Sequence, residues 1–267
     1  MRIDNVEVIA EGSGPKAIVM IHGWPDTHRL WDAQVAALKD RYRCVRFTLP
    51  GFDLSQPGRA YSLDEVVETI RKVVAETCGG QSTLLLHDWG CFFGYQFAMR
   101  HPELVERVIG VDIGDAGSRR HRGELGAKGL LMVMAYQMWL AFAWRIGGGT
   151  GNSMARWMAR TMRCPADPQG IGSQMGYPYA LRWLGVAGGF RGLRTFDPHG
   201  PMLYIYGERK PFLFHSRAWI ERLAARPGSR VLGLPTGHWV MLGRQREFND
   251  ALLAWLAETD KPATIRG

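Results

Sequence analysis

The sequence has few cysteines, and their spacing suits neither a disulfide framework nor a metal site. Cys44, Cys78, Cys91 and Cys164 are the only four among 267 residues, and no Gly-rich phosphate loop or dinucleotide fingerprint accompanies them. The polar start of the chain also lacks the apolar stretch of a signal peptide. We therefore expect a reduced, cytoplasmic protein that uses no metal and no other cofactor.

Acidic residues are scarce in one central segment. Between residues 116 and 200 the chain has eleven Lys and Arg but only three Asp and Glu, so the formal net charge of +8 lies entirely there. A basic excess confined in this way indicates a local role rather than a nucleic-acid-binding surface. We expect no nucleic-acid partner.

The same segment holds an apolar run, residues 129–144, that is short for a membrane span. Lys128 and Arg145 bound the run, which leaves about sixteen residues where a span needs roughly twenty. We favour a buried helix. The alternative is a weak membrane-surface contact, in which Trp and Met face lipid and the arginines face headgroups.

Outside this segment, short β-rich runs alternate with helix-like segments, a pattern typical of a mostly parallel sheet covered on both faces. The expected strands cover residues 6–10, 17–21, 44–49, 82–87, 108–112, 202–206 and 231–234. The expected helices cover residues 31–38, 63–76, 92–100, 216–225 and 244–258. Because so few residues precede the strand at 17–21, we expect the sheet to lack a first antiparallel strand.

The strand pattern vanishes between residues 118 and 198, where Trp, Met and Arg occur in helix-like stretches broken at Gly147–Gly151. This predicts a helical cap at 118–198, inserted between a first part of the α/β core, 1–117, and a second part, 199–267.

A carboxylate follows an apolar run that reads as a buried strand. Leu84–Leu86 and His87 lead into Asp88, and a small-residue helix start follows at once. An Asp at this strand-to-helix turn is a candidate nucleophile, since it is ionised at neutral pH and needs no base to activate it. The alternative is that Asp88 caps the following helix.

Two further segments reach the carboxyl ends of strands, where ligands of open α/β sheets bind. The turn after residue 21 places the backbone N–H of Trp24 there, and with the N–H of Trp89 it suits an oxyanion hole. His238 follows the last expected strand. We predict that His238 is the general base, because the order nucleophile, acid, histidine is typical of hydrolases on such a sheet.

These segments resemble the α/β-hydrolase superfamily. The similarity rests on His22-Gly23-Trp24-Pro25, His87-Asp88-Trp89-Gly90 and Gly237-His238, and His-Asp-Trp-Gly is characteristic of epoxide hydrolases and haloalkane dehalogenases. The resemblance implies an α/β-hydrolase fold with a mostly parallel central sheet flanked by helices, an inserted helical cap and a covalent alkyl-enzyme route. Two family glycines are replaced, by Leu86 and Cys91, without loss of a catalytic atom.

The third member of the family's triad is missing from its usual place. Most relatives carry an acid in the turn after the strand at 202–206, where this chain has Lys210. Some dehalogenases instead carry the acid after the strand that follows the nucleophile helix. By resemblance to them, Asp115 is our first choice and Asp112 our second. Glu208 is the third. The acid would hold His238 in the required tautomer and stabilise its cation.

The leaving group decides between two members of this branch. Epoxide hydrolases resemble one another in using two cap tyrosines. In this chain the spacing of Tyr136 from Asp88, and of Tyr179 from Lys210, is similar to the spacing in those enzymes. Tyr177 competes with Tyr179 for the second role. Tyr177 and Trp239 are also predicted to line the substrate pocket. The alternative for all three tyrosines is plain aromatic packing. Dehalogenases instead bind halide with two N–H donors, a role that the indoles of Trp24 and Trp89 also suit.

We therefore predict an epoxide hydrolase that acts through an alkyl ester of Asp88 and converts a small apolar or amphipathic epoxide to a diol. The first alternative is a haloalkane dehalogenase. The second is a ligand-binding protein without activity, an interpretation motivated by Lys210 and the basic cap. An esterase is disfavoured, because neither Ser nor Cys stands at the position of Asp88.

Overall fold

The computed structural model describes residues 1–197 and 200–260. Its central sheet has eight strands in the order β1-β2-β4-β3-β5-β6-β7-β8. The strands are β1 (Arg2–Ile3), β2 (Val6–Glu11), β3 (Ala17–Ile21), β4 (Arg43–Phe47), β5 (Ser82–His87), β6 (Val105–Val111), β7 (Met202–Gly207) and β8 (Arg230–Leu234). β3 to β8 run parallel, whereas β1 pairs antiparallel with β2 and β2 with β4. The seven expected strands are confirmed within a few residues.

The expectation that the sheet lacks a first antiparallel strand is wrong. β1 is only two residues long, which is too short to leave an alternating pattern in the sequence, and it pairs with β2 through Arg2 opposite Glu7 and Ile3 opposite Val6.

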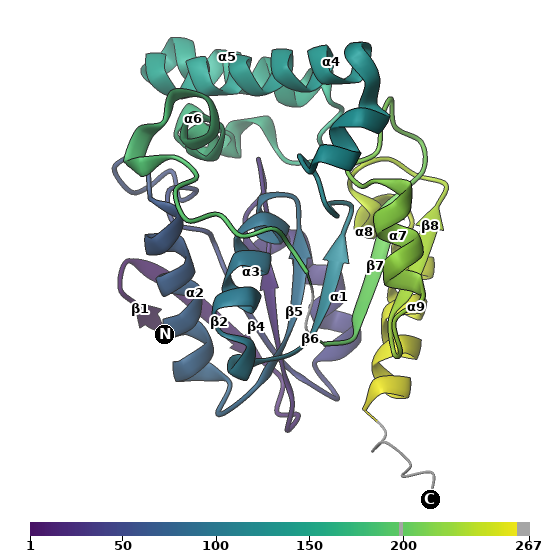
Figure 1. Ribbon diagram of the computed structural model, residues 1–267. Coiled ribbons are helices and arrows are strands. Elements are labelled where there is room, and N and C mark those ends of the chain that lie inside the picture. Colours follow the sequence, from purple (N-terminus) through teal and green to yellow (C-terminus); the bar gives the residue numbers. More distant parts are fainter. Residues whose placement is uncertain (198–199, 261–267) are drawn as a thin grey trace, which may run out of the picture.

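Helices cover both faces of the sheet (Figure 1). The helices of the core are α1 (Asp32–Leu38), α2 (Leu63–Thr77), α3 (Trp89–Arg100), α7 (Arg217–Ala224), α8 (Val240–Gly243) and α9 (Gln245–Thr259). Short 3-10 turns occupy His28–Trp31, Pro102–Leu104, Pro168–Gly170, Ser173–Gly176 and Val186–Gly188. Every residue of β3 and β5 is buried, as expected for parallel strands covered on both sides.

Two hydrophobic clusters lie on opposite faces of the sheet. Val19, Leu84 and Leu86 point to the face that α2 and α3 cover, together with part of the cap. Ile18 and Leu85 point to the other face, against α1 and α9. Side chains alternate along a strand, so one apolar run supplies both cores. The sheet is thereby held rigid, and its carboxyl edge becomes a fixed platform beneath the cap.

The cap region consists of α4 (Arg119–Ile146), α5 (Gly148–Thr161) and α6 (Tyr177–Leu184). α4 and α5 lie across the carboxyl edge of the sheet, at the top of Figure 1. α4 bends at Gly126, whose φ of 63° and ψ of 177° are not helical. The expected break at Gly147–Gly151 is confined to Gly147, and α5 begins at the next residue. The predicted cap end, residue 198, lies outside the described residues.

The apolar run of α4 is only partly buried, which corrects the expectation of a buried helix. Leu140, Ala141 and Ala143 are buried, but Leu131 and Ile146 are more than half exposed. Among the described residues, α4 is the one helix long and apolar enough to cross a membrane by length and composition, and 17% of its most apolar window is buried. An apolar run without amphipathic periodicity does not itself indicate which side is covered.

Candidate active site

Asp88 stands in a sharp turn between β5 and α3. Its backbone has φ 51° and ψ −120°, a conformation that L-residues rarely adopt. A Cβ on Gly23 would lie 2.4 Å from Asp88 Oδ2, and a Cβ on Gly90 would lie 2.2 Å from the Ile21 carbonyl oxygen. Only glycine therefore allows the two neighbouring segments to approach this turn.

The Asp88 carboxylate faces the His22–Asp26 turn rather than capping its own helix. Its side chain makes no capping hydrogen bond to α3. Instead the backbone N–H of Trp24 donates to Asp88 Oδ2 at 2.7 Å. This places the predicted oxyanion donor against the predicted nucleophile.

His22 fixes the turn that carries Trp24. The backbone N–H of Leu49 donates to His22 Nε2 at 2.9 Å, which leaves Nδ1 to donate to the Gly23 carbonyl oxygen at 2.9 Å. Burial lowers the pKa of His22 to about 4, so the ring stays neutral and keeps this tautomer. His22 is a positioning residue for the oxyanion donor.

His238 lies between two carboxylates, as a general base in a triad must. Its Nε2 is 3.7 Å from Asp88 Oδ1, and its Nδ1 is 2.5 Å from Asp112 Oδ2. Burial lowers the pKa of His238, but hydrogen bonding to Asp112 and the charges of both carboxylates outweigh burial and raise it to about 9. The gap of 3.7 Å is longer than a hydrogen bond.

Asp112, and not our first choice Asp115, holds His238. Asp112 is fully buried just after β6, and its positive φ of 69° turns the strand exit toward β7. Asp115 instead accepts from the backbone N–H of Ser216 and from the hydroxyl of Ser118, each at 2.7 Å. Asp115 therefore joins the α7 start to the α4 start.

Glu208, the third candidate acid, is exposed and also does not reach the histidine. Its backbone N–H donates to the Leu234 carbonyl oxygen at 2.9 Å, and a Cβ on Gly233 would meet its carboxylate at 2.4 Å. The side chain therefore lies over β8, at the edge of the sheet.

Lys210 forms a buried ion pair with Asp112. Its Nζ contacts Asp112 Oδ1, which also accepts from the backbone N–H of Gly207 at 2.9 Å. The two side chains are 7% and 0% exposed. Burial raises the pKa of Asp112, but the Lys210 charge and the His238 hydrogen bond outweigh burial and lower it. A cation thus occupies the usual acid position and anchors the acid of the neighbouring strand, an arrangement that the sequence analysis missed.

Tyr136 and Tyr179 converge above Asp88 from two cap helices. Their rings lie 6.2 Å apart, and the Tyr179 ring lies 5.1 Å from Trp89 and 6.1 Å from Trp24. Burial raises both pKa values above the ordinary value of 10, and the charge of Asp88 adds to the effect at Tyr179. Both phenols therefore keep their protons and remain hydrogen-bond donors at neutral pH.

Gln137, which sequence reasoning missed, positions one of these phenols. Its Nε2 donates to the Tyr136 oxygen at 3.0 Å, and its Oε1 accepts from Trp183 Nε1 at 3.0 Å. Because the phenol oxygen accepts, its own proton is left to point elsewhere. No sequence pattern distinguishes Gln137 from a surface glutamine.

The ring of Tyr177 packs beneath the cap, and its place in the substrate pocket stays a prediction. Tyr177 is fully buried, and its ring packs against Phe52, Tyr61 and Phe93. These contacts favour Tyr179, whose ring lies next to Trp89 and Trp24, for the second phenol role.

Trp239 packs against His238, and its place in the pocket lining stays a prediction. The two rings lie 5.0 Å apart, and Trp239 Nε1 donates to Asp26 Oδ2 at 2.9 Å. Burial raises the pKa of Asp26 to about 7, and the charge of Asp88 contributes in the same direction. Asp26 thus links the oxyanion turn to the loop of the base.

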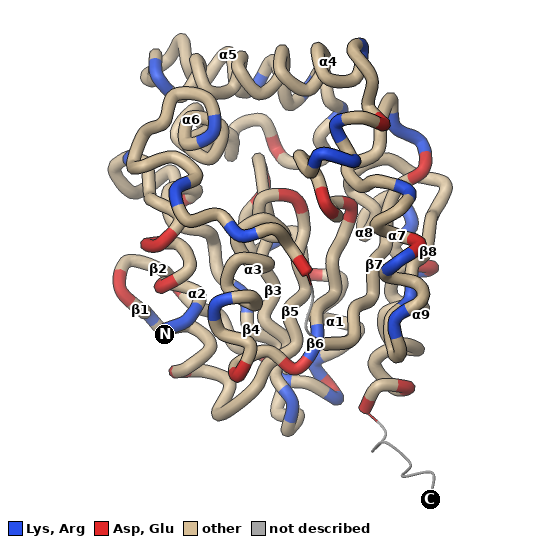
Figure 2. Tube along the Cα trace, viewed as in Figure 1, with Lys and Arg blue, Asp and Glu red and all other residues tan. Residues whose placement is uncertain are grey.

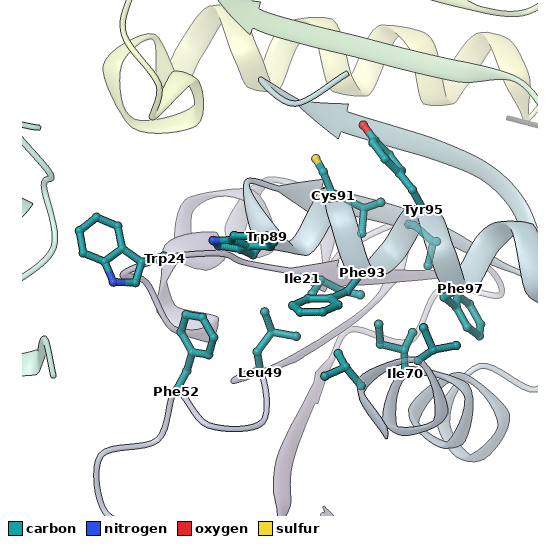
Figure 3. Packing of buried hydrophobic residues seen from close by; sticks show 14 of the residues in the cluster. Ile21, Trp24, Leu49, Phe52, Ile70, Trp89, Cys91, Phe93, Tyr95 and Phe97 are labelled. Atoms are coloured by element: carbon teal, nitrogen blue, oxygen red, sulfur yellow. The ribbon is translucent and has the colours of Figure 1, made fainter. Parts of the chain in front are cut away.

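The indoles of Trp24 and Trp89 are buried next to the nucleophile. They are 3% and 7% exposed, and in the described part of the chain neither Nε1 has a hydrogen-bond partner. Figure 3 shows the nitrogen of Trp89 directed toward Trp24. Both N–H groups are thus able to donate to a ligand that accepts hydrogen bonds next to Asp88.

Residues 16–140 match the family model described as alpha/beta hydrolase fold. The inhibitor-bound epoxide hydrolase of Bacillus megaterium superposes with a TM-score of 0.69 over 94% of this chain and 96% of that one, at 21% identity. The protein has an α/β-hydrolase fold. The described residues hold no group of three or more His, Cys, Asp or Glu placed to bind a metal ion.

Two curated proteins match part of this sequence. Epoxide hydrolase 1 of Caenorhabditis elegans is 34% identical over 118 residues, 43% of this chain and 29% of the relative. A cis-3-alkyl-4-alkyloxetan-2-one decarboxylase of Xanthomonas campestris is 33% identical over 107 residues, 36% of each. The chain thus covers about a third of the length of these relatives.

Proposed function

We propose that this α/β hydrolase is an epoxide hydrolase that forms a covalent ester on Asp88. The observation that supports the proposal is that the two oxygens of the Asp88 carboxylate have different partners. Oδ2 accepts from the backbone N–H of Trp24, while Oδ1 faces His238 at 3.7 Å and is free to attack. Tyr136 and Tyr179 supply protons above the same group.

In the first step Asp88 Oδ1 attacks an sp³ carbon of the epoxide. A carbon–oxygen bond forms as the ring carbon–oxygen bond breaks, and the electron pair passes to the leaving oxygen. The O–H groups of Tyr136 and Tyr179, which raised pKa values keep protonated, both hydrogen-bond this oxygen. One of them transfers its proton to the oxygen and becomes a phenolate.

In the second step water attacks Cγ of the ester while His238 takes a proton from the water. Esterification removes the negative charge of Asp88, which is one of the two charges that raise the pKa of His238. The imidazole therefore becomes less basic at the stage where it must be neutral. Trp24 N–H stabilises the oxyanion. Breakdown of the tetrahedral intermediate breaks the bond between Cγ and the substrate oxygen, and His238 returns its proton to this departing oxygen. The proton left on the Asp88 carboxyl passes to the phenolate formed in the first step, which releases the diol and restores both the carboxylate and the phenol.

Single turnover in ¹⁸O-water tests this route. Because water attacks Cγ, the label is expected in Asp88 after the first turnover, while the first diol carries an oxygen from the carboxylate. Label appearing directly in the first diol, with unlabelled Asp88, would show direct hydrolysis and contradict the ester.

A haloalkane dehalogenase is the second candidate, favoured by the unpaired indole N–H groups of Trp24 and Trp89. Two such donors next to the nucleophile suit a departing halide as well as an oxygen. A panel of epoxides and haloalkanes, scored for diol and halide together, separates the candidates. Halide release without diol formation would favour the dehalogenase. Tight binding with no turnover of either class would favour a ligand-binding protein.

The substrate class is expected to be small and apolar or amphipathic. Tyr136, Tyr179, Trp24 and Trp89 surround the nucleophile with aromatic surface, which favours an apolar group next to the reacting carbon. A series of terminal epoxides of increasing chain length tests this, with kcat/KM expected to rise with apolar area until the pocket is filled.

A further inference from the structure

The outward side of α4 is an apolar surface that no part of the described chain covers. Leu131, Phe142 and Ile146 are 59%, 46% and 56% exposed, whereas Leu140 and Ala141 are buried. The helical repeat places the three exposed residues on one side and Leu140 on the opposite side. The helix is apolar on both sides, but only one side packs against the rest of the described chain.

Helix α5 extends this surface. The rings of Trp139 and Trp157 lie 4.9 Å apart across the two helices, and they are 37% and 48% exposed. Trp139 Nε1 donates to the Met154 carbonyl oxygen, which holds the ring in place between α4 and α5. We define the outer cap face as Leu131, Met134, Trp139, Phe142, Ile146 and Trp157.

The charges around the outer cap face are all of one sign. No Asp or Glu lies between Glu124 and Asp167, and the tube in Figure 2 is largely uncharged along α4 and α5, with Lys and Arg near its ends. Lys128 and Arg145 bracket the apolar run on its outward side, and Arg160 stands near the end of α5. Within the described residues, these three cations make no ion pair.

The geometry restricts how this surface is covered. The inward side of α4 carries Tyr136 and packs on α6. Because this packing holds α4 against the rest of the cap, we do not expect α4 to cross a bilayer. A second copy pressed against the same face would bring two sets of unpaired cations together, which opposes association. An anionic surface with an apolar interior satisfies both the charges and the exposed side chains.

We propose that the outer cap face binds the surface of anionic lipid bilayers. Trp139 and Trp157 enter the headgroup region, Leu131, Phe142 and Ile146 reach the acyl boundary, and the basic residues contact lipid phosphates. The proposal stands whether or not the protein hydrolyses epoxides, because none of these side chains takes part in the proposed reaction.

Vesicle co-sedimentation of the full chain tests the proposal. Vesicles of phosphatidylcholine with about 30% phosphatidylserine are expected to bind the protein, and pure phosphatidylcholine vesicles to bind it much less. The double variant Leu131→Gln/Phe142→Gln is expected to bind at least about tenfold more weakly. Lys128→Gln/Arg145→Gln is expected to bind about thirtyfold more weakly, because each cation near the surface is worth about a fivefold effect.

Matched control variants distinguish binding by the outer cap face from non-specific binding to vesicles. Leu242 is 40% exposed on α8, away from α4 and α5, so Leu242→Gln is expected to bind like the parent protein. Arg41→Gln/Arg222→Gln removes two exposed cations outside the cap and is expected to have a small effect. Unchanged thermal unfolding of each variant establishes that the fold is intact.

Three results would overturn the proposal. One is that the parent protein does not bind anionic vesicles. Another is that Leu131→Gln/Phe142→Gln binds them as tightly as the parent does. The third is a concentration-dependent dimer that this double variant abolishes, measured by sedimentation velocity without lipid, which would show that the face joins two copies of the chain.

Discussion

Replacing Lys210 with methionine removes the cation that occupies the usual acid position while keeping most of the side-chain volume. Asp112 would retain the N–H of Gly207 and His238 Nδ1, at 2.9 and 2.5 Å, as partners for its two oxygens. The buried cluster would become more negative by one charge. We therefore expect His238 to hold its proton more tightly in the variant.

The size of the effect follows from Coulomb's law. Two charges on opposite sides of one carboxylate interact by about 2–3 kcal/mol at an effective dielectric constant of about 20. This corresponds to a rise of roughly 2 in the pKa of His238, which already lies near 9 in the parent protein. Ester hydrolysis needs neutral His238, so kcat of Lys210→Met is expected to fall at neutral pH and to recover as the pH rises.

The stability of the same variant is also expected to fall at neutral pH, but the loss of stability narrows in acid, whereas the loss of rate narrows as the pH rises. The folded-state pKa of Asp112 is lowered, so ionised Asp112 stabilises the fold above its unfolded pKa, and this contribution is lost as pH falls through the folded value. Removing Lys210 is expected to cost about 3 kcal/mol at neutral pH, because one partner of a buried pair is lost. The difference from the parent should narrow in acid.

The assay is the pH dependence of kcat for the parent protein, Lys210→Met and Lys210→Arg, with thermal unfolding measured alongside. Lys210→Arg keeps the charge and is expected to keep the parent's pH profile. A lower Tm for Lys210→Met with an unchanged pH profile would refute the reasoning, because Lys210 would then stabilise the fold without tuning the base.

Three further predictions concern the nucleophile's surroundings. Asp112→Asn is expected to lower kcat by about 10⁴-fold. Asp115→Asn should keep kcat and lose about 1–2 kcal/mol of stability, measured by denaturant unfolding. Equal losses of kcat in the two variants would contradict the assignment of Asp112 as the acid. Tyr136→Phe and Tyr179→Phe are each expected to lower kcat for epoxide opening by about 10²-fold, with the ¹H–¹⁵N spectrum as a check on folding, and unchanged rates would exclude the phenol role. Gly23→Ala would place a Cβ 2.4 Å from the nucleophile's Oδ2, so a loss of at least about 10²-fold in kcat is expected, and parent-like turnover would show that the turn adapts.

The sequence was sufficient to predict seven of the eight strands and to place the proposed nucleophile and base at one edge of the sheet. The apolar runs of β3 and β5 are each followed by residues that can take part in catalysis, the His22–Asp26 turn and Asp88. Parallel strands bring their carboxyl ends to one edge of the sheet. The sequence alone therefore placed Asp88 and His238 together, and the structure brings them to 3.7 Å.

The acid could not be chosen in the same way. Asp112 and Asp115 leave β6 in the same direction along the chain, and the choice depends on which side chain turns toward the last loop. The positive φ of Asp112 and its contact with Lys210 decide this. Both are consequences of tertiary packing that the local sequence does not encode.

Side-chain direction also limited the cap predictions. Tyr177 and Tyr179 are two residues apart on α6, so they point to different sides of the helix, one into the core and one toward Trp89. The run in α4 is apolar on every side, so the sequence did not reveal that Leu131 is exposed.

The covalent ester on Asp88 is tested most directly by intact-mass measurement of His238→Gln after incubation with an epoxide. Without the base, the first step is expected to proceed and the second to stall, so the protein should gain the mass of one epoxide, mapped by peptide analysis to Asp88. The adduct should be absent in Asp88→Asn/His238→Gln. An unmodified His238→Gln protein that still forms diol from the same epoxide would contradict the account.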